Sequence, residues 1–328
     1  MEYTTLSDTG IKVSKLALGT MSFGTRSDFN TAREVFNASV DAGINYFDTA
    51  DIYGNGKSEE FLGQLIHERN RDDFVIQTKG FFSNTQKSGM SRKHILNAID
   101  QSLERLQTDY VDVYLIHDFD TATSIEEVID TLNDLKKSGK ILALGVSNWA
   151  AWQIMESIGI SKLNHWSQVK VIEPLYNLAK RQIEADILPM AIKHHLAVTP
   201  FSPLGGGLLT GKYGRTGTAD QTGHLATDKI NHARYQNDYQ LAAEFTSFAK
   251  KAHYDPISLA IAWILHNPSI TAPLIGARNV SQLQPALASL KITLSEETYA
   301  AITALSTPPV PANGRTEENV LGKWSQND

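Results

Sequence analysis

The stretch VDVYLIHDFDTATSIEEVIDTLNDLKKSGKILALGVSN, residues 111 to 148, contains the unit from which the whole fold is predicted. It opens on a short apolar run rich in β-branched residues and ends on a second such run from residue 141. Between them, residues 124–137 repeat apolar positions at helical spacing, with Glu126 and Glu127 at the start and lysines at the end, as suits a helix dipole. Two strands joined by a crossover helix are typical of a parallel sheet.

The same unit repeats along the chain. Strands are predicted near residue 15 and at 45–50, 74–79, 111–117, 141–148, 167–173, 196–202 and 272–277. Helical periodicity covers 31–42, 57–68, 91–106, 124–137, 150–158, 181–193, 237–252, 256–265, 280–290 and 296–305. This alternation predicts an α/β fold, a (β/α)8 TIM barrel formed as one domain by residues 1–328, with an extra C-terminal helix.

One long interruption follows the seventh predicted strand. Residues 204–236 contain GGG and TGTADQTGH and few large apolar residues, so we expect a long loop that acts as a lid. The tail after Ser306 has three prolines by residue 311 and is expected to be irregular, in a position to fold back over a site.

The composition limits the classes of function. The 328 residues carry a net charge of -6 with no basic stripe, which argues against nucleic-acid binding. There is no cysteine, so disulfides, thiolate catalysis and Cys-ligated metals are excluded and redox chemistry needs a cofactor. The N-terminus lacks signal-peptide features, and the longest apolar run is far short of the roughly 20 residues that span a bilayer. We expect a cytoplasmic protein without a membrane partner; the oligomeric state stays open.

Four polar residues are predicted to converge where the barrel strands end. Asp48 ends the second strand, Tyr53 follows it, Lys79 ends the third and His117 ends the fourth. Taken singly, Tyr53 could be a rim residue, His117 a satisfied core histidine, and Asp48 and Lys79 a structural ion pair. Charges on otherwise apolar strands are expensive unless they are paired, so together the four residues favour a functional site.

Such a set suits carbonyl reduction. Hydride delivery to a carbonyl carbon leaves negative charge on the oxygen, which must be stabilised and protonated. Tyr53 can do both, because a phenol of pKa about 10 keeps its proton at neutral pH. Lys79 would favour the phenolate, Asp48 would hold Lys79, and His117 would orient the carbonyl.

These motifs resemble the aldo-keto reductases over nearly the whole chain. The segment FDTADIYGNGKSEEFLG at 47–63, QTKG at 77–80 and SLERLQTDYVDVYLIH at 102–117 match the family segments with the Asp, the Tyr, the Lys and the His. The resemblance implies a (β/α)8 barrel that binds NADPH or NADP+ in extended form and reduces an aldehyde or ketone, with Tyr53 as general acid.

The resemblance also implies the residues that contact the cofactor. Ser147, Asn148 and Gln168 would bind the nicotinamide carboxamide, Tyr176 would stack on the ring, and Arg278 and Gln282 would hold the 2'-phosphate and adenine. The segment PFSPLGGGLLTGKY would hold the pyrophosphate. The remaining predicted contacts are Gly19, Thr20, Met21, Ser202, Leu204, Gly206, Lys212 and Gly276. Two departures stand out: no proline follows His117 at the second position, and Ala286 replaces an asparagine common in the family.

Candidates for the substrate pocket are Phe23, Phe81, Asp118 and Trp149. A carboxylate at Asp118 would disfavour anionic substrates, although the same side chain could instead cap its loop. No metal site is predicted, because His194 and His195 fall on a helix end and no His-x-His lies on the first strand. A small-molecule carbonyl is the expected partner, and its identity is not readable from the sequence.

Two other classes of function stay open. A Schiff-base aldolase would use Lys79 as its nucleophile, but would leave Ser147, Tyr176 and Arg278 without a role. The resemblance extends to cytoplasmic subunits of potassium channels that retain a nicotinamide cofactor, so a nicotinamide-binding regulatory subunit is the second alternative.

Overall fold

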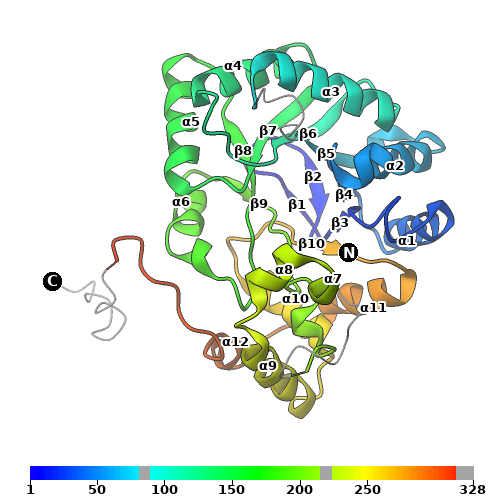
Figure 1. The fold of residues 1–328 in the computed structure, drawn as a ribbon, viewed down its shortest axis with the longest axis vertical. Helices are drawn as coiled ribbons and strands as arrows, with labels where there is room; N and C mark the ends of the chain where they lie inside the picture. The colour runs from blue at the N-terminus through cyan, green and yellow to red at the C-terminus, as the bar shows by residue number, and fades with distance from the viewer. Residues whose placement is uncertain (81–88, 215–223, 315–328) are drawn as a thin grey trace.

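A parallel sheet of eight strands forms the centre of the molecule (Figure 1). The computed structural model describes residues 1–80, 89–214 and 224–314. The strands are hydrogen-bonded in the order β10-β3-β4-β5-β6-β7-β8-β9. Their bounds are β3 Ala17–Gly19, β4 Tyr46–Asp48, β5 Val75–Gly80, β6 Val111–Ile116, β7 Ile141–Ser147, β8 Val169–Glu173, β9 Ala197–Val198 and β10 Leu274–Gly276.

Backbone hydrogen bonds bring the two outermost strands together. Thr271 N donates to Val198 O at 2.8 Å, and Leu274 N donates to Pro200 O at 2.9 Å. These contacts join the chain around β9 to the chain around β10, so the sheet curls round on itself. The predicted (β/α)8 barrel is therefore confirmed.

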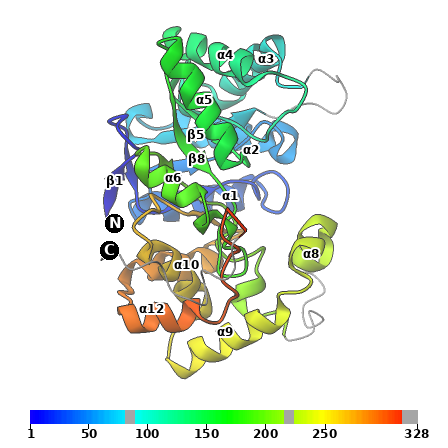
Figure 2. The same ribbon diagram turned by 90° about the vertical axis from the view of Figure 1, so that its left-hand side faces the viewer.

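Helices surround the strands in the views of Figures 1 and 2. They are α1 Phe29–Asp41, α2 Lys57–His67, α3 Arg92–Leu106, α4 Ile125–Lys137, α5 Ala151–Leu163, α6 Ile187–Lys193, α7 His224–Thr227, α8 Lys229–Tyr235, α9 Tyr239–Lys251, α10 Pro256–His266, α11 Val280–Ala288 and α12 Glu296–Thr303. Short 3-10 turns are η1 Tyr53–Gly56, η2 Arg71–Asp73, η3 Gln182–Glu184, η4 Leu208–Thr210 and η5 Ser289–Lys291. Within the described residues, no helix is long and apolar enough to cross a bilayer.

Local sequence explains where these helices begin. The Ser124 hydroxyl accepts from Glu127 N at 3.2 Å and caps α4, whose first turn is acidic and whose last turn carries two lysines, as predicted. Asp28 caps α1 by accepting from Thr31 N at 2.9 Å. The Asn279 side chain caps α11 in the same way, which fixes the segment that contains Arg278.

The structure departs from the sequence prediction at three places. The apolar run near residue 15 divides, because β2 (Lys12–Ser14) pairs antiparallel with β1 (Tyr3–Thr5) and only the following residues enter the barrel as β3. The segment predicted as helix 181–193 is a 3-10 turn followed by α6. The loop predicted at 204–236 contains η4, α7 and α8.

The barrel interior has an apolar layer and a polar layer. The apolar layer lies among buried side chains from the strands, and the hairpin residue Val13 belongs to the same cluster. Its members include Ala17, Tyr46, Val75, Val113, Leu115, Ala143, Val171 and Ala197. Toward the carboxyl ends of the strands the buried side chains become polar, at Asp48, Gln77, Lys79 and Glu173. The candidate site starts there.

Candidate functional site

Lys79 is the centre of the candidate active site. Its side chain is fully buried, and Nζ lies 2.5 Å from Asp48 Oδ1. The same ammonium donates to Thr49 O at 3.0 Å and lies 3.4 Å from the Tyr53 hydroxyl. Asp48 comes from β4, Lys79 from β5 and Tyr53 from the turn η1, so three successive chain segments place these groups in contact.

His117 completes the predicted set of four. It follows β6, where its backbone N donates to Gly80 O at 3.0 Å. Its ring lies 5.7 Å from the Tyr53 ring, centroid to centroid, at an interplanar angle of 81°. The structure therefore brings Asp48, Tyr53, Lys79 and His117 together at the carboxyl ends of neighbouring strands.

Burial and charge set the protonation states of these groups. Burial lowers the pKa of His117 to about 3, and the Lys79 charge acts in the same direction, so the imidazole is neutral at neutral pH. Burial raises the pKa of the Tyr53 phenol, with Lys79 opposing it. The pKa of Lys79 is also raised, because the attraction of Asp48 and Glu173 outweighs the effect of burial. A proton-bearing phenol thus lies beside a permanent cation.

Glu173 is a site residue that the sequence reasoning missed. It ends β8, is 3% exposed, and places Oε1 3.4 Å from Lys79 Nζ. The Gln77 amide donates to Glu173 Oε2 at 2.7 Å and to Asp48 Oδ1 at 2.8 Å. Glu173 ends the apolar run VKVIE just as Lys79 ends FVIQTK, so the rule that selected Lys79 would also have found it.

Ser147 and Asn148 lie beside this cluster, as predicted. Ser147 Oγ donates to Glu173 O at 2.9 Å, and Asn148 Nδ2 donates to His117 O at 3.0 Å. Asn148 is an exposed residue with a positive φ of 59°, a backbone strain that is common at functional sites. Asn148 is thus exposed beside the cluster, whereas Ser147 is 1% exposed and its hydroxyl is bonded within the protein; the roles predicted for both in binding the nicotinamide stay predictions.

The first barrel strand and the residues that follow it include a buried residue that supports the Asp48 strand and a residue exposed at the rim of the barrel. Thr20 is fully buried; its hydroxyl donates to Asp48 O at 2.9 Å and lies 2.7 Å from Ser58 Oγ, so it positions the Asp48 strand. Gly19 pairs in register with Gly276 on one side and Asp48 on the other. Met21 is 51% exposed and lies at the rim.

The glycine run after β9 has a left-handed backbone conformation. Gly205, Gly206 and Gly207 all have φ between 59° and 93°, and Ser202 has φ 56°. Side chains are strained in this region, which favours glycine at these positions, and two of the three glycine amides already donate within the loop, Gly205 N to Ser202 O at 2.9 Å and Gly207 N to Leu204 O at 3.1 Å. Leu204 is partly buried beside it, and Lys212 is exposed with Nζ 4.9 Å from the Tyr213 ring. The role of this segment in binding a pyrophosphate stays a prediction.

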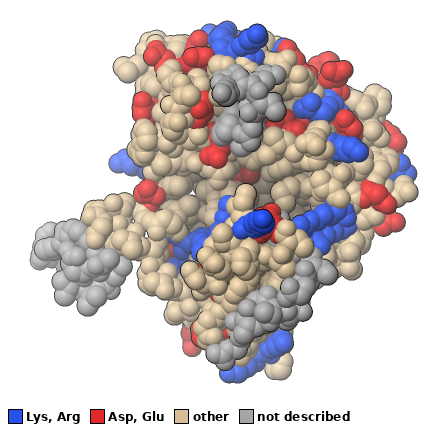
Figure 3. Space-filling view, in the orientation of Figure 1, with Lys and Arg blue, Asp and Glu red and all other residues tan. Residues whose placement is uncertain are grey.

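Cationic residues flank the start of α11. Arg278 N donates to Gln282 Oε1 at 3.1 Å, which holds Gln282 beside it, and Arg278 O accepts from Ser27 Oγ at 3.0 Å. Arg26, in the same loop as Ser27, has its pKa lowered by burial and by the Arg278 charge. Figure 3 shows Lys and Arg side chains beside a hollow on this face of the molecule.

Two predicted cofactor residues lie where they cannot take the predicted roles. Gln168 precedes β8 and so lies at the amino end of that strand, opposite the end that contains Glu173 and Ser147. Tyr176 is 0% exposed, with its ring 5.3 Å from the Trp263 ring and its hydroxyl donating to Glu184 at 2.8 Å. A ring packed in the core offers no face for stacking. Both assignments are corrected.

The four predicted substrate residues have four different outcomes. Phe23 is fully buried in the main core, so it does not line an open pocket. Trp149 is 5% exposed and packs edge-on against Phe119 at 5.1 Å. Asp118 Oδ1 accepts from Phe119 N at 2.8 Å, which favours the loop-cap interpretation, and burial raises its pKa. Phe81 lies outside the described residues.

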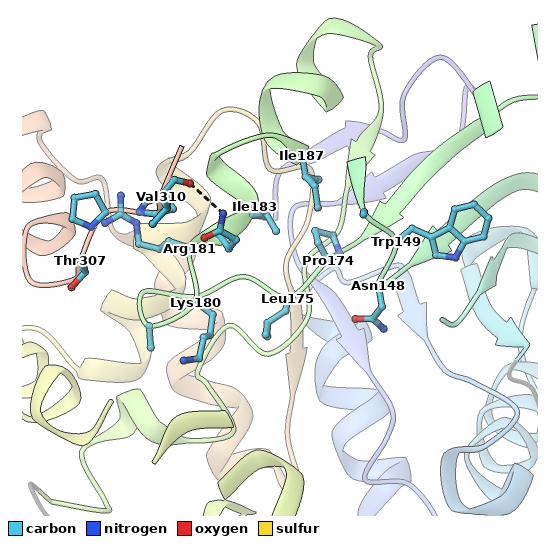
Figure 4. A pocket seen from close by; sticks show the side chains of 15 residues that line it. Asn148, Trp149, Pro174, Leu175, Lys180, Arg181, Ile183, Ile187, Thr307 and Val310 are labelled. Atoms are coloured by element: carbon cyan, nitrogen blue, oxygen red, sulfur yellow. Dashed lines mark hydrogen bonds between the residues drawn. The ribbon is translucent and has the colours of Figure 1, made fainter. Parts of the chain in front are cut away.

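A cavity of about 630 Å³ lies next to this cluster (Figure 4). Asn148 and Trp149 line one side of it and Thr307 to Val310 line the other, whereas Asp48, Tyr53, Lys79 and His117 are not among its lining residues. Gln182 Nε2 donates to Val310 O at 3.3 Å and holds the tail there. The other lining residues include the apolar Leu175, Ile183 and Ile187 and the polar Lys180, Arg181 and Gln182.

Comparison with known proteins agrees with this geometry. Residues 15–307 match the model of the "Aldo/keto reductase family". The chain is 34% identical to the "Uncharacterized oxidoreductase YrpG" of Bacillus subtilis, covering 90% of this chain and 93% of that protein. It is also 34% identical to a "Probable voltage-gated potassium channel subunit beta" of Arabidopsis thaliana, over 87% of this chain and 89% of that protein.

A third relative is a named reductase. The chain is 31% identical to the "Versiconal hemiacetal acetate reductase" of Aspergillus parasiticus, covering 95% of this chain and 98% of that protein. The matched family region contains all four residues of the barrel-mouth cluster, from Asp48 to His117. The chain therefore belongs to the aldo/keto reductase family.

Proposed function

We propose that this protein reduces an aldehyde or ketone to an alcohol with NADPH, and that Tyr53 is the general acid. The observation that carries the proposal is the position of Lys79 Nζ, 2.5 Å from Asp48 and 3.4 Å from the Tyr53 hydroxyl. A cation in contact with a phenol favours the phenolate that remains after proton transfer. The family's oxidoreductases support the same class of reaction.

The four residues have separate tasks in this reaction. Tyr53 donates a hydrogen bond and then its proton to the carbonyl oxygen as negative charge develops there. Lys79 stabilises the resulting phenolate, and Asp48 keeps Lys79 in place and charged. His117, neutral because its pKa is about 3, would hydrogen-bond the carbonyl oxygen and set its orientation.

The residues of the barrel mouth fit a nicotinamide dinucleotide. A bound NADPH would supply the hydride that reduces the carbonyl carbon. In this proposal Ser147 and Asn148 would hydrogen-bond its amide group, the 205–207 glycine run would hold its diphosphate, and Arg278 would bind the 2'-phosphate. Phe201, partly buried and three residues beyond the end of β9, is a better candidate than the fully buried Tyr176 for packing against the ring.

The cavity favours an uncharged substrate. Its two cations are already paired, Arg181 with Glu184 at 2.8 Å and Lys180 with Asp238 at 2.7 Å. The remaining wall is largely apolar, from Trp149 and Leu175 to the tail. We therefore propose a small neutral carbonyl compound as the partner.

A regulatory role is the second candidate. The relative named as a potassium channel β subunit supports it, since that protein shares 34% identity with the chain. A regulatory subunit would retain its cofactor through purification and turn over every tested carbonyl slowly. The cytoplasmic location expected from the sequence is likewise a proposal, which cell fractionation with an antibody against the chain would test.

The Schiff-base aldolase is disfavoured by the same geometry. A lysine must lose its proton to attack a carbonyl carbon. Lys79 instead has its pKa raised by Asp48 and Glu173 and is fully buried. Borohydride trapping with a carbonyl substrate would show a covalent adduct only if this conclusion were wrong.

The decisive experiment is steady-state kinetics with NADPH and with NADH across a panel of aldehydes, ketones and sugars. We expect turnover with NADPH, and a higher KM for NADH because Arg278 then has no phosphate to bind. Absence of turnover on every carbonyl, with cofactor bound through purification, would favour the regulatory subunit. Equal use of both cofactors would remove the role given to Arg278.

A further inference from the structure

The barrel interior contains two carboxyl groups for one lysine. Asp48 and Glu173 are 2% and 3% exposed, and Lys79 is fully buried between them. Lys79 Nζ lies 2.5 Å from Asp48 Oδ1 and 3.4 Å from Glu173 Oε1. If both carboxyl groups were ionised, the buried cluster would carry one uncompensated negative charge, which is costly in a medium of low dielectric constant.

Gln77 joins the two carboxyl groups but cannot neutralise them. Its Nε2 donates to Asp48 Oδ1 at 2.8 Å and to Glu173 Oε2 at 2.7 Å. The Tyr46 hydroxyl donates to Gln77 Oε1 at 2.5 Å, which fixes the orientation of the amide. Within the described part of the chain, Lys79 is the cation that forms an ion pair with Glu173. The missing positive charge must therefore be a proton.

We propose that Asp48 and Glu173 share one proton, which stays inside the barrel at neutral pH. The Gln77 amide donates to both carboxyl groups and so holds them near each other, and burial and the neighbouring Asp48 charge raise the pKa of Glu173. The cluster of Lys79 and two carboxyl groups is then neutral overall. Glu173 acts through Lys79 and is a positioning residue.

The shared proton affects how readily Tyr53 forms a phenolate. Glu173 is faced by Tyr46 and Asp48 from β4, by Lys79 from β5 and by Tyr53 from η1. Loss of the shared proton at alkaline pH would put a second full negative charge beside Lys79. That charge would disfavour the Tyr53 phenolate, because it cancels part of the stabilisation that Lys79 provides.

Infrared spectroscopy tests the shared proton directly. We expect the wild-type protein at pH 7 to show the C=O stretching band of a buried carboxylic acid, assigned by 13C labelling of Glu and Asp. Glu173→Gln and Asp48→Asn should each abolish it, because the remaining carboxyl group then ionises as the sole partner of Lys79. Asp118→Asn is the control that should retain it. No band in the wild type, or a band that survives both substitutions, would overturn the proposal.

Proton linkage provides a second test that uses folded wild-type protein. Between about pH 6 and pH 8 an unfolded chain has both carboxyl groups ionised, whereas the folded chain keeps one proton. A raised pKa in the folded state means that stability falls as pH rises through this range. The free energy of unfolding should fall with pH more steeply in wild type than in Glu173→Gln. The two slopes should differ by the amount that the uptake or release of one proton contributes. Equal slopes would overturn the proposal.

The kinetic consequence rests on the proposed function, and the other two tests do not. If the protein is a carbonyl reductase, the alkaline limb of its pH–rate profile, which reports loss of the Tyr53 proton, should move to lower pH in Glu173→Gln, because the variant has no second carboxylate to disfavour the phenolate. An unmoved limb beside the predicted infrared result would remove the effect on Tyr53 and leave the shared proton. If the wild-type protein reduced no carbonyl compound, the proposed function would be wrong. The infrared spectrum would still show whether Asp48 and Glu173 share a proton.

Discussion

Lys79 Nζ lies 3.4 Å from the phenolic oxygen of Tyr53 and 5.0 Å from the centroid of its ring. The cation is therefore closer to the ionisable oxygen than to the middle of the ring. It is placed to stabilise negative charge that appears on that oxygen after proton transfer. Lys79 cannot readily move away, because it is fully buried and held by Asp48 and by Thr49 O.

Tyr53→Phe is expected to remove most carbonyl reduction. The substitution keeps the ring and its edge-to-face contact with His117 but deletes the proton donor. General acid catalysis contributes about 10²- to 10⁴-fold to rates, so kcat should fall by roughly that factor. Steady-state kinetics with a neutral aldehyde measure it, and turnover near the wild-type level would remove Tyr53 from its central role.

Tyr176→Phe is the matched control for that experiment. It also deletes one phenolic hydroxyl, but one that donates to Glu184 at 2.8 Å and lies in the core against Trp263. We expect unchanged kcat and a loss of stability of about 1 kcal/mol, the usual net value of one hydrogen bond. A comparable fall in kcat for both variants would mean that the Tyr53 effect is not specific to catalysis.

The pH dependence of reduction should show no group titrating near a pH of about 6.5, the ordinary pKa of histidine. Burial and Lys79 lower the pKa of His117 to about 3, so the imidazole is already neutral across the physiological range. Because the pKa of His117 is lowered to about 3, its protonation should affect kcat/KM only as the pH falls toward about 3. The measurement is kcat/KM against pH. An inflection near the ordinary histidine pKa that disappears in His117→Asn would contradict the burial of this ring.

The barrel and the cluster of Asp48, Tyr53, Lys79 and His117 were predictable because both follow from short-range patterns. Alternating apolar runs and helical periodicity mark β4 to β8 and their crossover helices. Strand-end position then selects Asp48, Lys79 and His117 without knowledge of the side-chain contacts. The same rule selects Glu173, whereas Gln168 lies at the beginning of that run and not at its end.

Other errors depend on long-range packing that no local pattern shows. Tyr176 follows β8 closely enough to lie at the barrel mouth, but its ring turns into the space beside Trp263 on α10. Phe23 lies in a loop after β3, yet it is fully buried in the main core. The hairpin of β1 and β2 was missed because its two strands are only three residues each and resemble the start of one longer strand.

Arg278→Gln is expected to reduce the preference for NADPH over NADH. A charge-assisted hydrogen bond contributes about 1.5 to 3 kcal/mol, so the KM for NADPH should rise about 10- to 100-fold while the KM for NADH changes little. Binding of 2',5'-ADP, followed by calorimetry, gives a second readout that does not need turnover. Arg69→Gln is the control, since Arg69 lies over the Phe36 ring and bonds Asn37. An unchanged ratio of the two KM values would show that Arg278 does not read the 2'-phosphate.

Two glycine-to-alanine substitutions should change stability in opposite directions. At Gly145 in β7 a Cβ atom would lie 2.0 Å from Leu115 Cδ2 and 2.7 Å from Val171 O, where the pairing of β7 with β8 also shifts register. The backbone oxygen cannot move aside as a side chain can, so Gly145→Ala should lower the free energy of unfolding by about 1 to 3 kcal/mol. Thermal or urea unfolding measures the difference.

Gly159→Ala tests whether this effect comes from packing or from glycine itself. Gly159 lies in α5, and no atom lies within 4 Å of the position that an added Cβ would occupy, so alanine adds a methyl group to open space. Alanine is the better helix former by about 1 kcal/mol, and Gly159→Ala should therefore stabilise by up to that amount. If both substitutions destabilised equally, the close approach of β8 to Gly145 would not be the reason that this strand needs glycine.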